Sequence, residues 1–321
     1  MKPLLELNHV SYAYHSKNGE TAALSDLSFQ VFPGEFIAVI GPSGCGKSTL
    51  LSLISGLLLP ESGTILYTQR HAKEFSGHRR TRLARTDRRQ NELLLSDQTN
   101  RNSIGYMLQK DHLFEWRTIY RNILLGLEIQ HRLDENARAR VDKMLKDYGL
   151  EPFRDARPSE LSGGMRQRAA LIRTLAPDPE LLLLDEPFSA LDYQTRLAVC
   201  DDVAAILRRE RKTALLVTHD LSEAISMADR ILVLTKRPAR IRTILTIRFI
   251  REEPDGNPSG RSPLEQENPD QTPSGTPPFE GKASDKSPSR LTPFERRGEP
   301  EFQEYFHYLW KELNADEQNL Q

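Results

Sequence analysis

A glycine-rich stretch at residues 41–48, Gly-Pro-Ser-Gly-Cys-Gly-Lys-Ser, limits the fold more than any other feature of the chain. It matches the spacing G-x-x-x-x-G-K-[ST], in which the glycines let the backbone curl so that successive N–H groups face inward. It follows a continuous apolar run over residues 36–40 and precedes a helical pattern over residues 48–59, which ends before Pro60. A turn without a ligand would need neither the lysine nor the hydroxyl, so the stretch predicts a phosphate-binding loop between a strand and a helix.

The residue types of this loop indicate a nucleotide and a metal ion. We expect Lys47 to reach the β- and γ-phosphates and Ser48 to ligate Mg²⁺, while the helix N-terminus attracts negative charge. Cys45 lies in the loop, but the pattern gives its thiol no redox function. The residues expected to contact the nucleotide are Gly41, Pro42, Ser43, Gly44, Cys45, Gly46, Lys47, Ser48 and Thr49.

The other strand patterns place this loop in an α/β fold. Residues 4–31 alternate apolar and polar positions and contain small turn residues, as antiparallel strands do. Continuous apolar runs are typical of strands buried on both faces, and they occur at residues 36–40, 181–184, 214–217 and 231–234. Because such strands alternate with helical patterns, we expect a mainly parallel sheet covered by helices.

Two acidic residues, Asp185 and Glu186, end the buried run at residues 181–184. Ligands of open parallel sheets bind beyond the carboxyl ends of the strands, so both carboxylates are expected to face the nucleotide. Asp185 is placed to hold Mg²⁺, and Glu186 is then available to polarise the attacking water. The alternative is a solvated strand end, which the phosphate-binding loop upstream makes the weaker interpretation.

Charge and composition exclude several classes of protein. The net charge is −1, so no global field attracts nucleic acid or anionic lipid. Two cysteines in 321 residues are no disulfide framework, which favours a reducing, cytosolic compartment. No signal-peptide core follows Met1, and no apolar run reaches the roughly 18 residues of a membrane span. If the protein works at a membrane, partners are expected to hold it there.

Two polar segments interrupt the pattern. The arginine-rich segment at residues 69–102 and the Pro-, Ser- and Gly-rich segment at residues 252–290 have too few apolar residues to offset the entropy of ordering, so both are predicted to be disordered. For the first, a solvated loop is favoured over a site for anionic lipid or nucleic acid. An apolar face of a short terminal helix follows, formed by Phe302, Tyr305, Phe306, Leu309 and Leu313.

The stretch Leu-Ser-Gly-Gly-Met-Arg-Gln-Arg at residues 161–168 resembles the signature motif of ATP-binding-cassette (ABC) ATPases, and the order of motifs is theirs. The resemblance covers residues 4 to about 247 and extends to the terminal helix; residues 104–116 and 236–241 look like nitrate, sulfonate and taurine import ATPases. It implies a P-loop NTPase fold: a RecA-like, mainly parallel sheet with an antiparallel N-terminal β subdomain and an α-helical subdomain. About 20 to 25 residues near 69–102 look inserted relative to the family.

This resemblance implies domain bounds. The expected parts are an ATP-binding domain at residues 1–250, with a helical subdomain at about 110–165, a linker at 251–293 and an amphipathic helix at 294–321.

The resemblance also implies roles for single residues. Tyr14 is similar to the aromatic residue that stacks on adenine, with Tyr12 as the competing candidate and ordinary packing as the alternative for both. Gln109 resembles the glutamine that senses Mg²⁺ and the γ-phosphate, and His219 resembles the switch histidine, although a lone histidine after a strand is usually structural.

The signature and the segment after Glu186 receive roles in the same way. Ser162, Gly163 and Gly164 resemble residues that close on the γ-phosphate of an opposite subunit; from the residues alone they are a helix cap and a turn. Residues 189–192 resemble the loop that couples the two sites of a dimer.

The expected function is that of an ATP-hydrolysing subunit that powers an importer of a small anionic solute. The resemblance implies a homodimer at the cytoplasmic face of the membrane, permease subunits and, through them, an extracytoplasmic solute-binding protein. One alternative is a soluble ABC-type ATPase acting on nucleic acid or ribosomes; the near-zero net charge and the lack of a coiled-coil insertion oppose it. A second alternative is a non-catalytic ATP-binding regulator, and the intact Glu186 and His219 argue against it.

Overall fold

The computed structural model describes residues 2–17, 19–68, 80–85, 103–249, 266–267 and 291–318. The chain divides into two compact units, one built from residues 1–95 and 216–321 and the other from residues 96–215. We call them the first and the second unit. The expected bounds of the ATP-binding domain, its helical subdomain and the linker remain a proposal.

An antiparallel sheet lies in the N-terminal part of the first unit, as the alternation over residues 4–31 predicts. Its strands are β1 (Leu5–Ser16), β2 (Gly19–Val31), β4 (Ser62–Thr68) and β5 (Arg80–Arg85), in the order β2-β1-β4-β5. Gly63 has φ 85°, and a Cβ there would lie 2.3 Å from the carbonyl oxygen of His9. Only glycine therefore lets β4 approach β1 this closely.

Parallel pairing also occurs within the first unit. Strand β3 (Phe36–Ile40) pairs in parallel with β9 (Arg230–Leu234), and both are buried along their whole length. Strand β9 pairs antiparallel with β10 (Ile241–Thr246), which in turn pairs with β11 (Gln266–Glu267). Strand β8 (Thr213–Val217), also fully buried, leads into helix α8 (Leu221–Met227). The four apolar runs thus form buried strands, and β10 is a strand that the apolar runs did not predict.

Helix α1 (Lys47–Ile54) follows β3 through the phosphate-binding loop, but it is shorter than its apolar spacing predicts. The expected helix over residues 48–59 instead ends at Ile54, and Gly56 just beyond has φ 75°. A glycine with positive φ shortly after the last helical residue is a common helix terminator, and it acts here before Pro60 is reached. Leu57, which the helical pattern over residues 48–59 includes, consequently lies outside the helix and is exposed.

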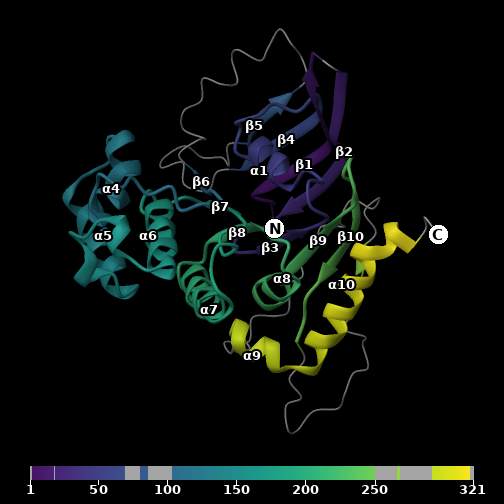
Figure 1. The fold of residues 1–321 in the computed structure, drawn as a ribbon. Helices are drawn as coiled ribbons and strands as arrows, with labels where there is room; N and C mark the ends of the chain where they lie inside the picture. Colours follow the sequence, from purple (N-terminus) through teal and green to yellow (C-terminus); the bar gives the residue numbers. More distant parts are fainter. Residues whose placement is uncertain are drawn as a thin grey trace. The chain divides into compact units, whose positions relative to one another are not determined.

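The second unit combines two parallel strands with helices (Figure 1). Strand β6 (Ile104–Met107) pairs in parallel with β7 (Leu181–Asp185). Its helices are α4 (Ile119–Ile129), α5 (Glu135–Asp147), α6 (Gly163–Leu175) and α7 (Tyr193–Arg209), with short turns at Glu151–Phe153 and Pro158–Glu160. Thr118, Asp134, Ser162 and Asp192 cap the four helices at their N-termini, so each start is fixed by a side-chain oxygen.

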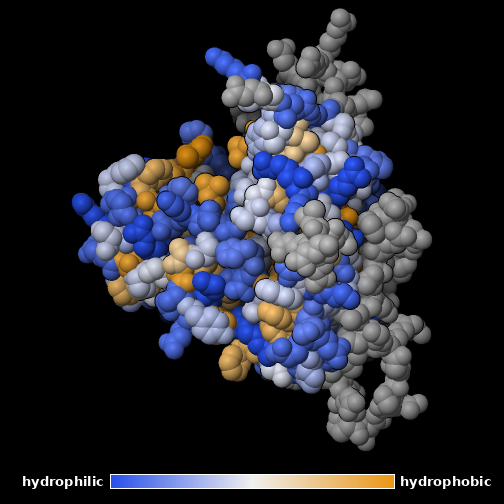
Figure 2. All heavy atoms as spheres, turned by 45° about the vertical axis from the view of Figure 1, so that its right-hand side comes forward, coloured by the Kyte–Doolittle hydropathy of each residue, from blue (hydrophilic) through white to orange (hydrophobic). Residues whose placement is uncertain are grey.

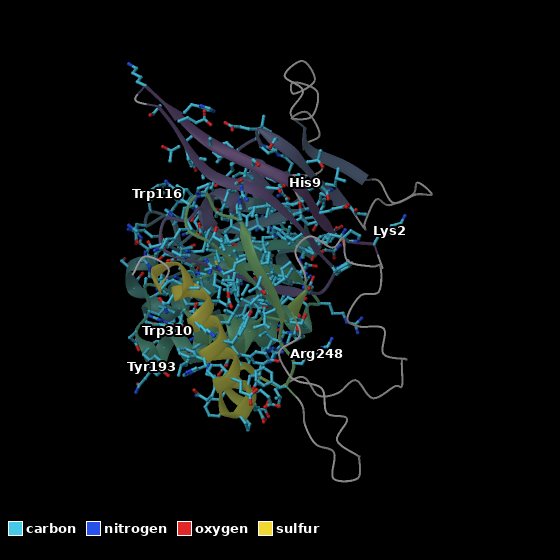
Figure 3. All side chains as sticks on the ribbon, turned by 90° about the vertical axis from the view of Figure 1, so that its right-hand side faces the viewer. Lys2, His9, Trp116, Tyr193, Arg248 and Trp310 are labelled. Atoms are coloured by element: carbon cyan, nitrogen blue, oxygen red, sulfur yellow. The ribbon has the colours of Figure 1, made fainter. Side chains whose placement is uncertain are left out.

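Two C-terminal helices, α9 (Pro293–Gly298) and α10 (Pro300–Gln318), pack against α8 in the first unit (Figure 1). Phe302, Tyr305 and Leu309 form the buried face that the helical spacing predicts. The hydroxyl of Tyr305 accepts a hydrogen bond from the Arg248 N–H at 2.9 Å and donates one to the Arg248 carbonyl at 2.8 Å. Figure 3 labels Arg248 after β10 and Trp310, which is exposed, on α10. Leu313 is only partly buried.

The two segments predicted to be disordered lie largely outside the described residues. Within them the structure describes Arg80–Arg85 as β5 and Gln266–Glu267 as β11. Over these short stretches the chain is extended and paired, which composition did not predict because strand pairing depends on the partner strand.

On the face shown in Figure 2, hydrophobic residues are scattered in small groups among hydrophilic ones. Among the residues that the structure describes, no helix combines the length and the apolar character needed to cross a membrane.

Candidate nucleotide site

The phosphate-binding loop of the first unit depends on glycine at two positions. Gly44 has φ 72° and Gly46 has φ 124°, a region that side chains with a Cβ rarely adopt. A Cβ on Gly46 would also lie 2.8 Å from Leu24 Cδ2 and 3.1 Å from the Ala23 carbonyl oxygen. Gly44 is therefore required by the curl of the loop, and Gly46 by both the curl and the packing of β2 against the loop.

Lys47 begins helix α1 and lies against the loop that precedes it. Its buried ammonium donates hydrogen bonds to the carbonyls of Gly41, at 2.8 Å, and Pro42, at 3.1 Å. Both acceptors are neutral, so a phosphate oxygen brought into the loop would offer this cation a stronger, charge-assisted partner. Ser43, Gly44 and Ser48 are exposed at the same loop, where a ligand can reach them.

Cys45 faces away from this ligand side of the loop. Its side chain is buried, and a Cβ built on Gly41 would lie 3.0 Å from its sulfur. Burial raises the pKa of the Cys45 thiol, partly offset by the nearby Lys47 charge. The thiol is thus kept in its protonated, unreactive form.

The two candidate aromatic residues of β1 differ in their surroundings. Tyr14 is 42% exposed, and its hydroxyl shares a hydrogen bond of 3.0 Å with Thr49 Oγ1 in helix α1. Tyr12 is half-buried and meets the Tyr14 ring edge-on, at 5.0 Å between centroids and 88° between planes. Burial raises the pKa of Tyr12, as do the neighbouring Tyr14 and Glu61. Tyr14 is therefore the ring that is both exposed and anchored to the phosphate-binding loop's helix.

His219 stands exposed at the end of β8, in a loop fixed from both sides. The buried Thr218 hydroxyl donates to Glu223 Oε2 at 2.6 Å. Asp220 caps α8 by accepting from the N–H groups of Ser222 and Glu223. The imidazole thus projects from a rigid support.

In the second unit, the predicted carboxylates lie at the end of β7 and directly after it, where Tyr106 of β6 and Gln109 of the loop after β6 contact them. Asp185 is buried and accepts a hydrogen bond from the Tyr106 hydroxyl at 3.4 Å. Glu186 is partly exposed, has φ 45°, and its Oε2 accepts from Gln109 Nε2 at 3.2 Å. A non-glycine residue with positive φ costs free energy and persists where surrounding structure demands it. Gln109 and Glu186, 77 residues apart in sequence, are thereby brought together.

The signature residues begin helix α6. Ser162 caps the helix by accepting from the Met165 N–H at 3.4 Å, as the residues alone predict. Ser162 and Gly163 are exposed, whereas Gly164 is buried against α7. A Cβ on Gly164 would lie 2.8 Å from Thr195 Cγ2, so glycine is needed there for the packing of α6 on α7.

The motifs of both units match those of known proteins. A family model described as ABC transporter matches residues 24–189. The chain belongs to the ABC transporter family. It is therefore an ATP-binding, transport-coupled ATPase, and its α/β fold is that of the ABC cassette.

Three similar proteins support this assignment. An uncharacterized ABC transporter ATP-binding protein, YtlC of Bacillus subtilis (strain 168), is 39% identical over 311 residues, 97% of this chain and 96% of the relative. The taurine import ATP-binding protein TauB of Jannaschia sp. (strain CCS1) is 34% identical over 254 residues, 79% of this chain and 85% of the relative. A dimeric post-hydrolysis structure of the ATP-binding cassette MJ0796, bound to ADP and Pi, matches 77% of this chain and 100% of that one, with a TM-score of 0.60 and 28% identity.

Sequence reasoning missed several contacts of this ABC ATPase. Tyr106 has no role predicted from the sequence, yet its hydroxyl contacts Asp185. Arg166 lies inside the signature stretch without an assigned role, although it binds Asp111, 55 residues away. No local spacing signals such pairs, because the first depends on the pairing of β6 with β7 and the second on how the loop after β6 meets helix α6.

Proposed function

We propose that this ABC ATPase energises an importer for a small anionic solute of the taurine, sulfonate or nitrate kind. It would act at the cytoplasmic face of the membrane, held by permease subunits that receive the solute from an extracytoplasmic binding protein. The similarity to the taurine import protein TauB supports the direction and class of transport. Residues 104–116 and 236–241, which resemble this group of importers, support it independently.

One observation carries the hydrolytic mechanism: the hydrogen bond between Gln109 Nε2 and Glu186 Oε2 at 3.2 Å. Glu186 is the proposed general base, since its carboxylate can accept a proton from an attacking water. Gln109 would orient that carboxylate and release it when a γ-phosphate and metal ion compete for the amide. His219 would position the water from its fixed loop.

Mg²⁺ fits the oxygen donors that the chain offers. Ser48, Gln109 and Asp185 supply a hydroxyl, an amide and a carboxylate, the ligand types that this ion prefers alongside phosphate and water. When bound, Mg²⁺ neutralises charge on the β- and γ-phosphates. Among the described residues no group of three or more His, Cys, Asp or Glu could hold a metal ion by itself.

The proposed working form is a homodimer with ATP between the phosphate-binding loop of one copy and the signature of the other. The exposure of Ser162 and Gly163 at the start of α6 supports this, because these groups can meet a ligand from outside the chain. The dimeric form of MJ0796 bound to ADP and Pi offers a structural parallel. Tyr14 would stack on the adenine and Lys47 would hold the phosphates.

The decisive experiment replaces the proposed base. Glu186→Gln should keep ATP binding and reduce steady-state turnover at least about hundredfold, in the range that general base catalysis contributes. Glu180→Gln, at the start of the strand that Glu186 follows, is the matched control and should turn over like the unmodified chain. Turnover by Glu186→Gln at the rate of Glu180→Gln would refute the role.

The solute is tested separately. With permease subunits and binding protein reconstituted, we expect ATP-dependent uptake of taurine, other sulfonates or nitrate. Pyrimidine-like solutes serve as the comparison class, and their exclusive uptake would contradict the proposed substrate class.

A further inference from the structure

Two arginines of helix α6 hold the loop that begins with Gln109. We call residues 109–116 the switch loop. Arg166 donates from Nε to Asp111 Oδ2 at 2.8 Å and from Nη2 to Asp111 Oδ1 at 3.2 Å, a two-pronged contact. The same Nη2 pairs with Glu115 Oε1 at 3.0 Å. Arg166 thus forms ion pairs with two carboxylates of the switch loop.

Arg173, which lies nearer the C-terminus of the same helix, donates hydrogen bonds to the backbone of the loop. Its Nη2 donates to the Asp111 carbonyl at 2.6 Å and its Nη1 to the His112 carbonyl at 2.7 Å. Asp111 also stabilises the loop itself, because Oδ1 accepts from the Leu113 N–H at 3.0 Å. The switch loop is therefore fixed to α6 by both side chains and main chain.

The Arg166–Asp111 pair is stronger than an ordinary surface ion pair. The side chains are only 27% and 20% exposed, and the fork of the guanidinium meets both carboxylate oxygens. Burial by itself would raise the pKa of Asp111, but the hydrogen bonds and charge of Arg166, with the Leu113 N–H, lower it. The carboxylate is therefore charged at neutral pH, and the pair is intact under working conditions.

Arg166 lies in the first turns of α6, and its N–H bonds the carbonyl of Ser162 at 2.9 Å. We infer that Arg166 is a positioning residue that joins the switch loop to the signature helix, so that Gln109 and residues 162–164 move as one body in the ATP cycle. This inference rests on the proposed function, in which Gln109 responds to the nucleotide and the signature meets the opposite copy. Loss of the γ-phosphate at one end would then displace the signature at the other.

The test is a double-mutant cycle on ATP turnover by the full-length chain. Arg166→Met and Asp111→Asn each break the pair, and we expect each to lower kcat about tenfold, the loss typical of a charge-assisted hydrogen bond. ATP affinity, measured with a fluorescent analogue, should change less than about twofold, because neither residue belongs to the phosphate-binding loop. The double variant should be no worse than the poorer single one, since both remove the same contact. Arg166→Lys should recover part of kcat, because it keeps the charge without the fork.

Arg209→Met is the control, since it breaks another ion pair of the second unit, Arg209–Asp147 at 3.1 Å, and should leave kcat unchanged. Unchanged kcat in Arg166→Met, or losses that multiply in the double variant, would overturn the inference. If Arg166→Met does not fold, Asp111→Asn and Arg166→Lys decide in the same way. Glu186→Gln is measured in the same assay. If Glu186→Gln retains turnover, the proposed function fails. If Glu186→Gln is inactive while Arg166→Met is fully active, only this inference fails.

Discussion

Lys47 both stabilises the phosphate-binding loop and offers a charge to a phosphate ligand. Its ammonium is buried against the carbonyls of Gly41 and Pro42, which stabilise the curl through ordinary hydrogen bonds. A bound phosphate would replace these neutral acceptors by charged ones, so binding and loop geometry depend on the same group. Ser48 next to it is exposed and contributes a hydroxyl at the ligand side.

Lys47→Ala should therefore weaken nucleotide binding itself, in contrast to Glu186→Gln. We expect the dissociation constant for ATP to rise at least about tenfold, because a charge-assisted contact with phosphate is lost. Equilibrium binding of a fluorescent ATP analogue checks this, with thermal unfolding to show that the loop still folds. An affinity equal to that of the unmodified chain would count against the assigned role.

At the scale of elements, the sequence predicts the buried strands well, but it predicts helix ends and long-range contacts poorly. Strands β3, β7, β8 and β9 follow from apolar runs alone, because a strand buried on both faces needs no partner-specific pattern. Helix α1 ends earlier than its apolar spacing suggests, since the backbone at Gly56 decides its end. The contacts of Arg166 and Tyr106 arise from chain segments far apart in sequence, which one sequence cannot reveal.

The switch loop presents one aromatic side chain to the exterior. Trp116 is 73% exposed, while Phe114 is partly buried beneath it with 4.7 Å between ring centroids. The buried Asn122 fixes Phe114 by accepting from its N–H at 2.7 Å and donating to its carbonyl at 3.0 Å. Trp116 is therefore not part of the core, and the partly buried Phe114 ring supports it.

Trp116→Ala should uncouple transport from hydrolysis. We propose that the exposed Trp116 side chain contacts the permease, because residues 104–116 resemble those of import ATPases. The variant should therefore lower transport by the assembled complex about tenfold or more, while basal turnover and thermal stability of the isolated chain persist. Phe114→Ala should show the same loss with some loss of stability, since its ring is partly buried.

Ile129→Ala, which removes another exposed apolar side chain of the second unit, is the control for Trp116→Ala. Transport at the control's level in Trp116→Ala would place the permease contact elsewhere. Loss of basal turnover in both aromatic variants would show instead that they maintain the fold.

For the whole molecule, the sequence motifs predict the chemistry of each unit better than they predict how helices far apart in sequence pack together. The phosphate-binding loop and the carboxylates are predicted from short spacings in the sequence, whereas the role of the signature follows only from the family resemblance. The packing of α9 and α10 on α8 was not predicted, although the buried face of α10 was predicted. That packing depends on contacts such as Arg296 Nη1 to the Ala228 carbonyl at 2.8 Å, between residues 68 positions apart. In the proposed mechanism, function at this scale requires a second copy of the chain.

The proposed dimer can be tested through Ser162, which is exposed and caps α6. Asp and Asn are equally good caps and nearly equal in volume, so Ser162→Asp and Ser162→Asn should fold alike. In the dimer, however, the added carboxylate would face the triphosphate held by the opposite copy. In a Glu186→Gln background, we expect the Asn variant to sediment as a dimer with ATP and the Asp variant to remain monomeric.

Like charges in contact at an interface cost several kcal/mol, so the dimer dissociation constant should differ between the two variants by about a hundredfold or more. Equal ATP affinity and equal melting temperature in both variants would confine the difference to the interface. If the Asp variant dimerises with ATP as readily as the Asn variant, the signature does not meet the nucleotide of the opposite copy, and the head-to-tail dimer must be abandoned.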